Sequence, residues 1–355
     1  MSLPSWRLLG LVLLLPAGCA TDDQPALDVG VDLSVPDVDT PDGHQGPRSI
    51  LLPEDESPHS DEMEWWYYTG RLQGDGGEVF GFELTVFQMI FADKPLYISH
   101  FAVTDLQTGL YHSDMQVETE DQRALGPGFT LKVGSIEMTG HGGQHRLRAT
   151  TKDAAIELAL GAEKPPVLHY GTGWMNVAAD DPFYYYSYTR MAASGRISVE
   201  GVSRKVTGEA WMDHQWGTIG TGFGWDWFSL RLDDRTEVML FRVRREGKLG
   251  FVGGTIIDDQ GGWQPLKADA FDAVATGRWT SPHTGVTYTN GWRVTVPALQ
   301  LDVQVVPMVQ DQEFALTLFG SPIYWEGLCD VTGTRAGKAA TGHAYVEITG
   351  DMSKM

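Results

Sequence analysis

The stretch from Glu209 to Leu232 constrains the fold most, because it places four tryptophans within 24 residues. It reads EAWMDHQWGTIGTGFGWDWFSLRL, with extended runs on either side of a Gly-rich middle, and this pattern predicts strand, loop, strand. Alternate side chains of a strand share a face, so His214 and Trp216 would lie on one face and Asp213 on the other. Two interpretations stay open: a thick aromatic core, or an aromatic pocket whose few polar groups do chemistry.

Short runs of β-branched and aromatic residues, separated by Gly and Asp turns, continue along the chain from His59 onward. Examples are residues 78–88, 97–104, 238–243 and 292–296. Long amphipathic helices are hard to find in this pattern. We therefore predict an all-β fold of sandwiches or barrels.

A weak internal repeat at an offset of 160 residues suggests two similar β-domains. Trp65 falls on Trp225, and Tyr67 falls on Trp227. Arg71 and Leu72 fall on Arg231 and Leu232 in the same way. The expected domains are residues 59–192 and 193–355, with the boundary between residues 190 and 196.

The chain opens with the features of an export signal. Arg7 precedes the apolar run Leu8 to Leu15, and Ala17-Gly18-Cys19 follows. We expect residues 1–19 to be a signal peptide, too short to span a membrane as a mature helix. The ending resembles a bacterial lipobox, which predicts lipidation of Cys19 and an outer-membrane lipoprotein facing the periplasm. The alternative is ordinary cleavage and a soluble periplasmic protein.

Residues 20–58 are expected to form an acidic, disordered tether. They hold ten Asp and Glu residues against a single base, Arg48, and few apolar side chains. The whole chain carries a net charge of −21, and no basic stripe appears, so we expect no nucleic-acid partner. Of the two cysteines, lipidation of Cys19 would leave Cys329 without a disulfide partner.

The motif EWWYYTG at 64–70 places a carboxylate beside large apolar side chains. In a strand Glu64, Trp66 and Tyr68 would share a face. Apolar surroundings raise the pKa of an acid and make Glu64 a candidate proton donor. The alternative is a Glu at a strand entrance, solvated or paired with an Arg.

Two further stretches hold candidate functional groups. The run DPFYYYSYTR at 181–190 could line a cavity with tyrosine hydroxyls, Tyr186 among them, or form an aromatic ladder in a sheet. His214 could be a general base, a proton donor, or a structural His held by Asp213. Because no HExxH motif or Cys cluster is present, we expect no metal.

Five motifs together resemble the AttH/carotenoid 1,2-hydratase family. They are EWWYYTG, YYYSYTRMAASGRISV, GEAWMDHQWG, GWDWFSLRLDD and GHAYVEITG. The resemblance implies two tandem lipocalin-like β-barrel domains with an apolar cavity. It also implies hydration of linear carotenoids or related isoprenoids without a metal or organic cofactor. Several members look linked to export systems, so an ABC-type export system is a further expected partner.

The resemblance also assigns residues. His59 fits the His ahead of the WWYY motif, and His214 with Trp216 fits the His-x-Trp of the second motif. The hydratases carry an acid on the strand after the second Trp cluster. Here that strand, residues 238–244, has none, and Glu237 lies only at its start.

Alkene hydration explains these residue types, because it needs a neutral carboxylic acid or a protonated histidine in an apolar cavity, and aromatic faces that stabilise a cation. The alternative function is a non-catalytic lipid-binding accessory protein of an export system. A hydrophobic small molecule is the expected ligand of either. The candidate catalytic residues are His214, Asp213, Asp226 and Glu64, and the candidate substrate-binding residues are Trp216, Trp225, Trp227, Trp66, Tyr68, Tyr186 and His59.

Lipidation of Cys19 can be tested in cells. Globomycin should make the unprocessed precursor accumulate, because the antibiotic blocks cleavage before a lipidated cysteine. Processing that continues in globomycin, together with a cleaved and soluble Cys19→Ser variant, would rule the anchor out.

Overall fold

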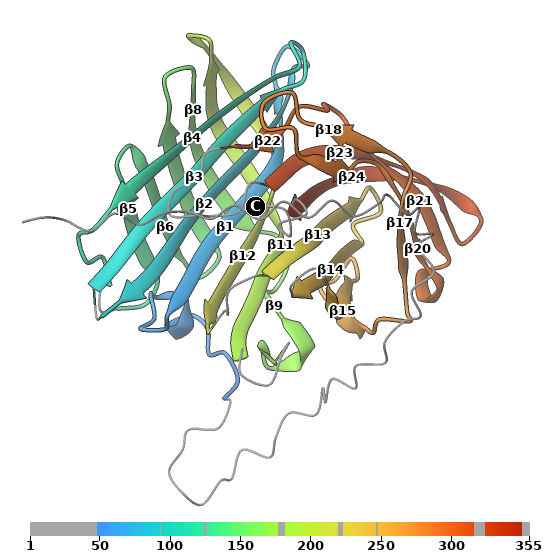
Figure 1. Ribbon diagram of the computed structural model, residues 1–355, viewed down its shortest axis with the longest axis horizontal. Coiled ribbons are helices and arrows are strands. Elements are labelled where there is room, and N and C mark those ends of the chain that lie inside the picture. Colours follow the sequence, from blue (N-terminus) through green and yellow to red (C-terminus); the bar gives the residue numbers. More distant parts are fainter. Residues whose placement is uncertain are drawn as a thin grey trace, which may run out of the picture. The chain divides into compact units, whose positions relative to one another are not determined.

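A computed structural model describes residues 48–92, 94–123, 126–176, 182–218, 223–245, 248–315 and 324–349. Almost all of these residues lie in strands or turns, which confirms the predicted all-β fold (Figure 1). Cys19 and the predicted signal peptide lie outside the described residues. Within them, no helix has the length and apolar character needed to cross a membrane. The short 3-10 helices are η1 (Glu54–Glu56), η2 (His169–Gly171) and η3 (Pro297–Leu299).

The first sheet curls until its two ends approach each other, with β5 contacting β3 and β4. Two short strands, β9 and β10, pair with β11 beside the main path. In spatial order the strands are β4 (Leu110–Glu118), β3 (Lys94–Asp105), β2 (Val79–Phe91), β1 (Met63–Gly74), β12 (Val202–Gly217), β11 (Pro182–Val199), β8 (Ala154–Ala162), β7 (Gln144–Thr150), β6 (Ile136–His141) and β5 (Phe129–Val133), with β9 (Val167–Leu168) and β10 (Trp174–Asn176).

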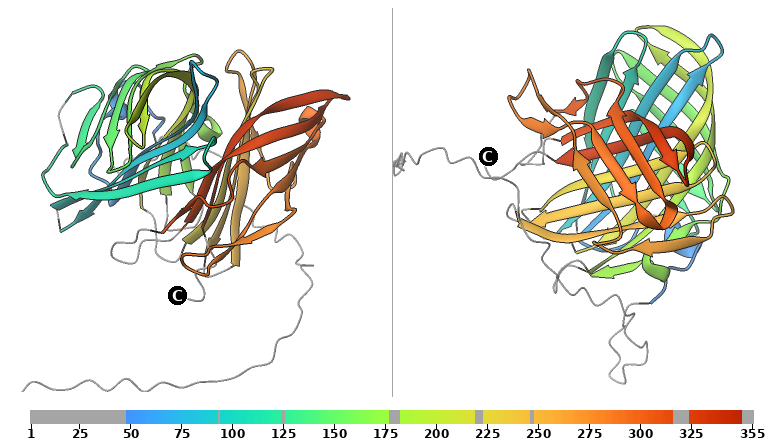
Figure 2. Two further views of the ribbon diagram at one scale, coloured as in Figure 1. Left: turned by 90° about the horizontal axis from the view of Figure 1, so that it is seen from above. Right: turned by 90° about the vertical axis from the view of Figure 1, so that its right-hand side faces the viewer.

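The second sheet is built in the same way from the C-terminal part of the chain (Figure 2). The hairpin of β18 (Arg278–Thr280) and β19 (Thr287–Thr289) stands apart from it. In spatial order its strands are β16 (Trp263–Leu266), β15 (Lys248–Ile257), β14 (Glu237–Arg245), β13 (Phe223–Leu232), β24 (Lys338–Thr349), β23 (Tyr324–Arg335), β21 (Leu301–Pro307), β20 (Trp292–Val296) and β17 (Asp272–Ala275), with β22 (Glu313–Phe314) beside β23.

The internal repeat corresponds to equivalent strands of the two sheets. β1 lies between β2 and β12, and β13 lies between β14 and β24. Thr69 faces Trp211 across the β1–β12 pair, and Ser229, 160 residues later than Thr69, faces Tyr345 across the β13–β24 pair. The strands β12 and β24 also match each other, as GEAWMDH against GHAYVEI.

The structure moves the boundary between the two domains. β11 runs unbroken through residues 190–196 and pairs with β12 as far as Gly217, so the predicted division cuts a strand of the first sheet. The second sheet begins only at Phe223. The sequence analysis placed the boundary at a Gly-containing turn. In the structure β11 pairs with β12 beyond that point, so the first sheet extends to Gly217.

The last residues of the predicted tether are part of the folded first domain. Ile50 joins the core inside the first sheet, and Glu56 is fully buried. The Glu56 carboxylate accepts hydrogen bonds from the Gly142 backbone N–H and the Tyr188 hydroxyl. The disorder prediction was therefore wrong for residues 48–58, because Asp55 and Glu56 are held by specific partners.

Each sheet encloses a hydrophobic core, and a third apolar cluster lies where the outer faces of the two sheets meet. We call this contact the junction, and define it by the residues of the third cluster, which include Tyr67 and Trp211 from the first sheet and Trp227 and Tyr345 from the second. Gly81 lets the sheets approach, because a Cβ there would lie 2.8 Å from the Tyr345 hydroxyl.

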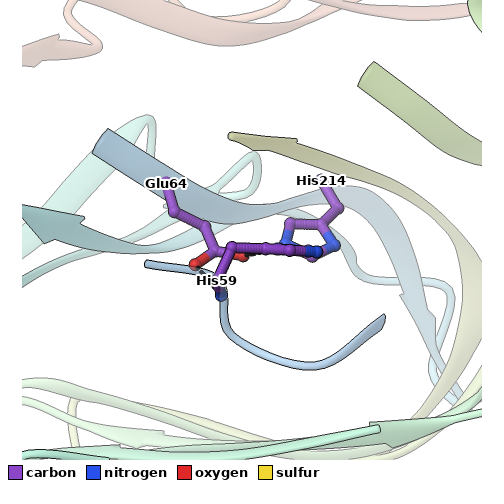
Figure 3. A group of neighbouring side chains, drawn as sticks. All are labelled: His59, Glu64 and His214. Carbon is purple, nitrogen blue, oxygen red and sulfur yellow. Dashed lines mark hydrogen bonds and ion pairs between the residues drawn. The ribbon is translucent and has the colours of Figure 1, made fainter. Parts of the chain in front are cut away.

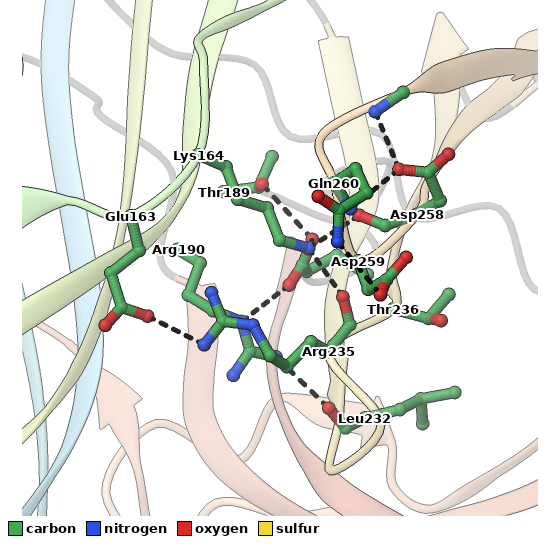
Figure 4. A network of polar contacts seen from close by, with 12 residues as sticks. Glu163, Lys164, Thr189, Arg190, Leu232, Arg235, Thr236, Asp258, Asp259 and Gln260 are labelled. Atoms are coloured by element: carbon green, nitrogen blue, oxygen red, sulfur yellow. Dashed lines mark hydrogen bonds and ion pairs between the residues drawn. The ribbon is translucent and has the colours of Figure 1, made fainter.

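A buried ion network crosses from the first sheet to the second (Figure 4). Lys164 Nζ donates to Glu237 Oε2 at 2.5 Å, and Arg190 Nε donates to Glu237 Oε1 at 2.6 Å. These three side chains are all nearly inaccessible to solvent. Lys164 also donates to the carbonyl oxygens of Arg235 and Asp258. Glu237 therefore accepts bonds from two cations that belong to the other half of the chain.

Glu237→Gln should destabilise the protein by about 3–5 kcal/mol, because it leaves two buried cations without their anion. The matched control is Glu163→Gln, whose exposed pair with Arg235 is expected to contribute about 0–1 kcal/mol. Chemical denaturation of the full chain measures both. Equal stability of the two variants would contradict this role for Glu237.

Candidate functional site

The first polar centre lies inside the first sheet and joins three of the predicted site residues (Figure 3). Glu64 projects from β1, His214 from β12, and His59 from the segment before β1. Glu64 Oε1 lies 2.7 Å from His59 Nδ1 and 2.7 Å from His214 Nε2. Its Oε2 accepts the His59 backbone N–H at 2.7 Å and the Gln88 amide at 3.0 Å. Every position around this carboxylate is thus occupied by a donor.

Aromatic rings enclose this centre, as the alternation of the two strands predicts. Trp216 stacks on His59 with ring centroids 4.0 Å apart, and Trp66 stacks on His214 at 4.6 Å. The Tyr186 hydroxyl lies 3.2 Å from His214 Nδ1. Tyr68, from the same face, pairs with His145 instead. The structure therefore brings together six of the predicted residues, His59, Glu64, Trp66, Tyr186, His214 and Trp216, and places Tyr68 in the same core.

Hydrogen bonds fix the charges of this centre. Burial alone would lower the pKa of His59, but Asp55 and Glu64 outweigh it and raise the pKa to about 9. Burial would raise the pKa of Glu64, yet the bonds from His214 and His59 hold it below its ordinary value. For His214 burial dominates and lowers the pKa. At neutral pH the centre is an ionised Glu64 between a cationic His59 and a neutral His214.

The donor set of this centre could hold a metal ion. One ligand atom each of His59, Glu64 and His214 lie within 4.8 Å of one another, and two imidazoles with a carboxylate suit a transition-metal ion. A second group of this kind, His112, Asp153 and Glu200, lies nearer the surface. In the first group the same atoms already satisfy each other by hydrogen bonding. The absence of a metal stays a prediction.

A cavity of about 400 Å³ opens elsewhere in the first domain, across strands β5 to β8. Its lining includes Phe129, His141 and His145. His214 and Trp216, predicted as catalytic and substrate-binding residues, do not contribute to the wall of this cavity. Both rings are instead covered by other aromatic side chains.

The remaining predicted residues lie away from this centre. Asp213 and Trp227 face the junction, because Asp213 is the neighbour of His214 along β12 and so points to the opposite face. Trp225 is packed against the same cluster. Asp226 forms a two-pronged ion pair with Arg244, with both N–O distances at 2.7 Å. The grouping of Asp213, Asp226 and Trp227 with His214 was therefore wrong.

Asp213 is held by three donors at the junction. Its carboxyl group accepts bonds from Tyr185 at 2.7 Å, Trp211 at 2.6 Å and Ser187 at 2.5 Å. Burial raises the pKa of Asp213 to about 7 against the effect of these donors. His169 lies 2.8 Å from Ser187 and extends the chain of bonds. Asp213 is thus fully engaged.

Three other carboxyl groups beside the junction have no cation within bonding distance in the part of the chain that the structure describes. They are Glu83 on β2, Glu326 on β23 and Glu347 on β24, the last two directly opposite each other. Burial is the main cause that raises the pKa of Glu83 to about 8 and of Glu347 to about 7, and it raises the pKa of Glu326 well above its ordinary value. Around neutral pH this cluster retains protons.

Glu83 and two neighbours have polar atoms that make no hydrogen bond within the described part of the chain: Glu83 Oε2, His100 Nε2 and Thr69 Oγ1. In register Glu83 faces Thr69, and Thr85 faces His100, so all share the face turned to the second sheet. Such buried atoms are rare and cost about 1–3 kcal/mol each when unpaired. They mark a place where a bound molecule would find partners.

Sequence reasoning missed Glu83 and His100. The available signal was a lone Glu in GFELTVF and a lone His in ISHFAV, each a polar residue inside an apolar strand. Their strands read as buried on both faces, which leaves no solvent-facing row for such a side chain. The aromatic motifs, which cluster elsewhere in the sequence, directed the prediction to β1 and β12.

The chain is similar in structure to several solved proteins. A protein described as AttH from Nitrosomonas europaea is 28% identical, covers 85% of this chain and 97% of its own, and superposes with a TM-score of 0.76. Kievitone hydratase from Nectria haematococca is 17% identical, with coverage of 87% and 95% and a TM-score of 0.70. CghA is 11% identical, with coverage of 86% and 95% and a TM-score of 0.54.

Comparison with curated proteins found no match. The AttH-like family, in contrast, matches residues 44–351, which include both sheets, the centre of His59, Glu64 and His214, and the junction. The resemblance seen in the sequence motifs is thereby confirmed, and with it the lipocalin-like fold of the solved relative. The chain belongs to the AttH-like family.

Proposed function

We propose that this protein is a cofactor-free hydratase that adds water to a trisubstituted alkene of an apolar, isoprenoid-like molecule at the junction. One observation carries the proposal: Glu83 is a buried carboxyl group that has no cation partner among the described residues, and its Oε2 makes no hydrogen bond with them. The solved relative named as a hydratase supports the same class of reaction.

Glu83 fits the role of general acid better than the acids chosen from the sequence. Glu64 is ionised and saturated with donors, and Asp213 accepts three bonds. Among the described residues, Glu83 accepts a side-chain hydrogen bond only from the Thr85 hydroxyl, at 2.8 Å on Oε1. Because burial raises its pKa to about 8, the group carries a proton at neutral pH and can donate it.

The reaction balances without a cofactor. Glu83 transfers its proton to the less substituted alkene carbon, which leaves a tertiary cation and the Glu83 carboxylate. A water molecule then adds its oxygen to the cation. The oxonium that forms gives one proton back to the Glu83 carboxylate. The net change is alkene plus water to tertiary alcohol.

His100 is suited to hold the attacking water. Burial lowers the pKa of His100 to about 3, so the ring is neutral. Its Nδ1 lies 2.8 Å from the Tyr324 hydroxyl, and Phe314 stacks on the ring at 4.2 Å, which fixes its orientation. With Nδ1–H donating to the Tyr324 hydroxyl, Nε2 is placed to accept a hydrogen bond from the water. The aromatic faces nearby, Tyr67 and Trp227 among them, stabilise a cation.

We also propose that the protein works in the cell envelope, anchored through Cys19, with the apolar ligand and an export system as partners. The support is the sequence of residues 1–19 and the resemblance described above. If the protein binds the ligand without converting it, the alternative function applies: a non-catalytic lipid-binding accessory protein of an export system. The following experiment separates the two functions.

Glu83→Gln should abolish hydration, because an amide keeps the shape of the side chain but cannot act as an acid. Purified full-length protein is incubated with lycopene and with squalene in ¹⁸O-labelled water, and labelled tertiary alcohol is measured by mass spectrometry. The expected loss is about 10²–10⁴-fold. In the wild type, turnover should fall as pH rises above about 8, where Glu83 loses its proton.

Glu313→Gln is the matched control, because Glu313 is equally buried but lies away from the junction contacts of Glu83, bonded to Ser281, Thr284 and Tyr288. It should retain turnover. Thermal melting of both variants separates loss of chemistry from loss of folding. A folded Glu83→Gln variant with unchanged turnover would contradict the assignment, and binding of the isoprenoids without labelled product from the wild type would favour the accessory protein.

A further inference from the structure

Arg231 is a fully buried cation without a hydrogen bond. Its side chain is 0% exposed, and Nε, Nη1 and Nη2 all lack a partner within the described residues. It projects from β13 toward the junction, between Leu230 and Leu232, which face the core of the second sheet. Burial without a partner lowers the pKa of Arg231 to about 10. A guanidinium group in this setting is costly unless an anion binds it.

The internal repeat places different residues opposite the two equivalent arginines. In the first sheet Arg71 faces Glu209 across the β1–β12 pair. In the second sheet the equivalent Arg231 faces His343 across the β13–β24 pair. A Glu stands opposite one Arg, and a neutral side chain stands opposite the other. His343 Nε2 also makes no hydrogen bond in the described structure.

The nearby acids already serve other cations. Glu237 binds Lys164 and Arg190. Glu209 binds Arg190 at 2.5 Å, and its other oxygen lies 3.9 Å from His343 Nε2. This end of the junction therefore holds more buried cations than anions, and the excess positive charge lies on Arg231.

We propose that Arg231, with His343 beside it, binds the carboxylate of an amphipathic isoprenoid acid whose alkene is presented to Glu83. The substrate part of this inference rests on the proposed function. A guanidinium group binds a carboxylate through two parallel hydrogen bonds. A planar carboxylate therefore suits a closed site better than a bulkier anion does. Tyr345 lies two residues after His343 on the junction face of β24, and its hydroxyl approaches β2 at Gly81, two residues before Glu83. The head-group site and the acid therefore lie along one junction.

The test compares farnesoic acid with farnesol, which share the isoprenoid chain but differ in the anionic head group. Wild-type full-length protein should bind the acid at least about tenfold more tightly at neutral pH, measured by calorimetry. Arg231→Met, which keeps most of the side-chain volume, should remove that preference and should not destabilise the fold, since it removes an unpaired buried charge. Arg293→Met, which alters an exposed ion pair, should keep the preference.

Inorganic phosphate and acetate distinguish a ligand head group from a free anion. If either salt raises the melting temperature of the wild type as much as farnesoic acid does, and Arg231→Met abolishes the effect, the site holds a free anion and the ligand assignment is overturned. Equal affinity of the wild type for acid and alcohol overturns the proposal, even if the Arg231 variant does not fold.

Failure of this inference and failure of the proposed function give different results. Glu83→Gln should bind farnesoic acid as the wild type does, because Glu83 does not contact the head group in this account. A preference for the acid without any hydration would leave the anion site standing and remove the hydratase. Hydration of isoprenoids by a protein that shows no preference for the acid would support the hydratase and rule out the anion site.

Discussion

The structure depends on burying carboxyl groups where two curled sheets meet. A carboxyl group between β-sheets without a cation partner stays neutral, because its charged form is poorly solvated there. Glu83, Glu326 and Glu347 meet this condition, and the bond from Tyr67 to Glu326 spans the two sheets. Where cations are present, as at Glu237, the same burial gives a structural ion network instead. One end of the junction thus holds protonated acids because cations are absent from the described residues around them, and the other holds an ion network because cations are present.

Equivalent positions of the two halves of the chain hold different residues, and these differences explain which buried polar groups have no hydrogen-bond partner among the described residues. His214 in the first half corresponds to Ile348 in the second, so the described part of the second sheet has no histidine at the place where His214 meets Glu64 in the first. Glu209 corresponds to His343, which leaves Arg231 unpaired. One duplicated framework therefore supplies a closed polar centre, an acid site and a cationic site without a change in strand order.

The sequence predicted the parts of the structure that follow from local pattern. Alternation along β1 and β12 correctly separated Trp66 and Tyr68 from Tyr67, and Trp216 from Trp211. The same alternation implied that Asp213 and His214 point apart, but the prediction still joined them because they are adjacent in one motif. Glu83 could not be assigned, since its importance depends on the second sheet, which meets it from more than two hundred residues away. The boundary of the first domain was missed because β11 continues through a Gly-containing segment.

The most direct test of the central claim is the protonation state of Glu83 in the folded protein. An infrared difference spectrum between the wild type and Glu83→Gln at neutral pH reports it, because neutral and ionised carboxyl groups absorb at separate frequencies. We expect the substitution to remove a neutral carboxylic acid band. Removal of ionised carboxylate bands would contradict the role of Glu83, because the proposed acid would then have no proton to give.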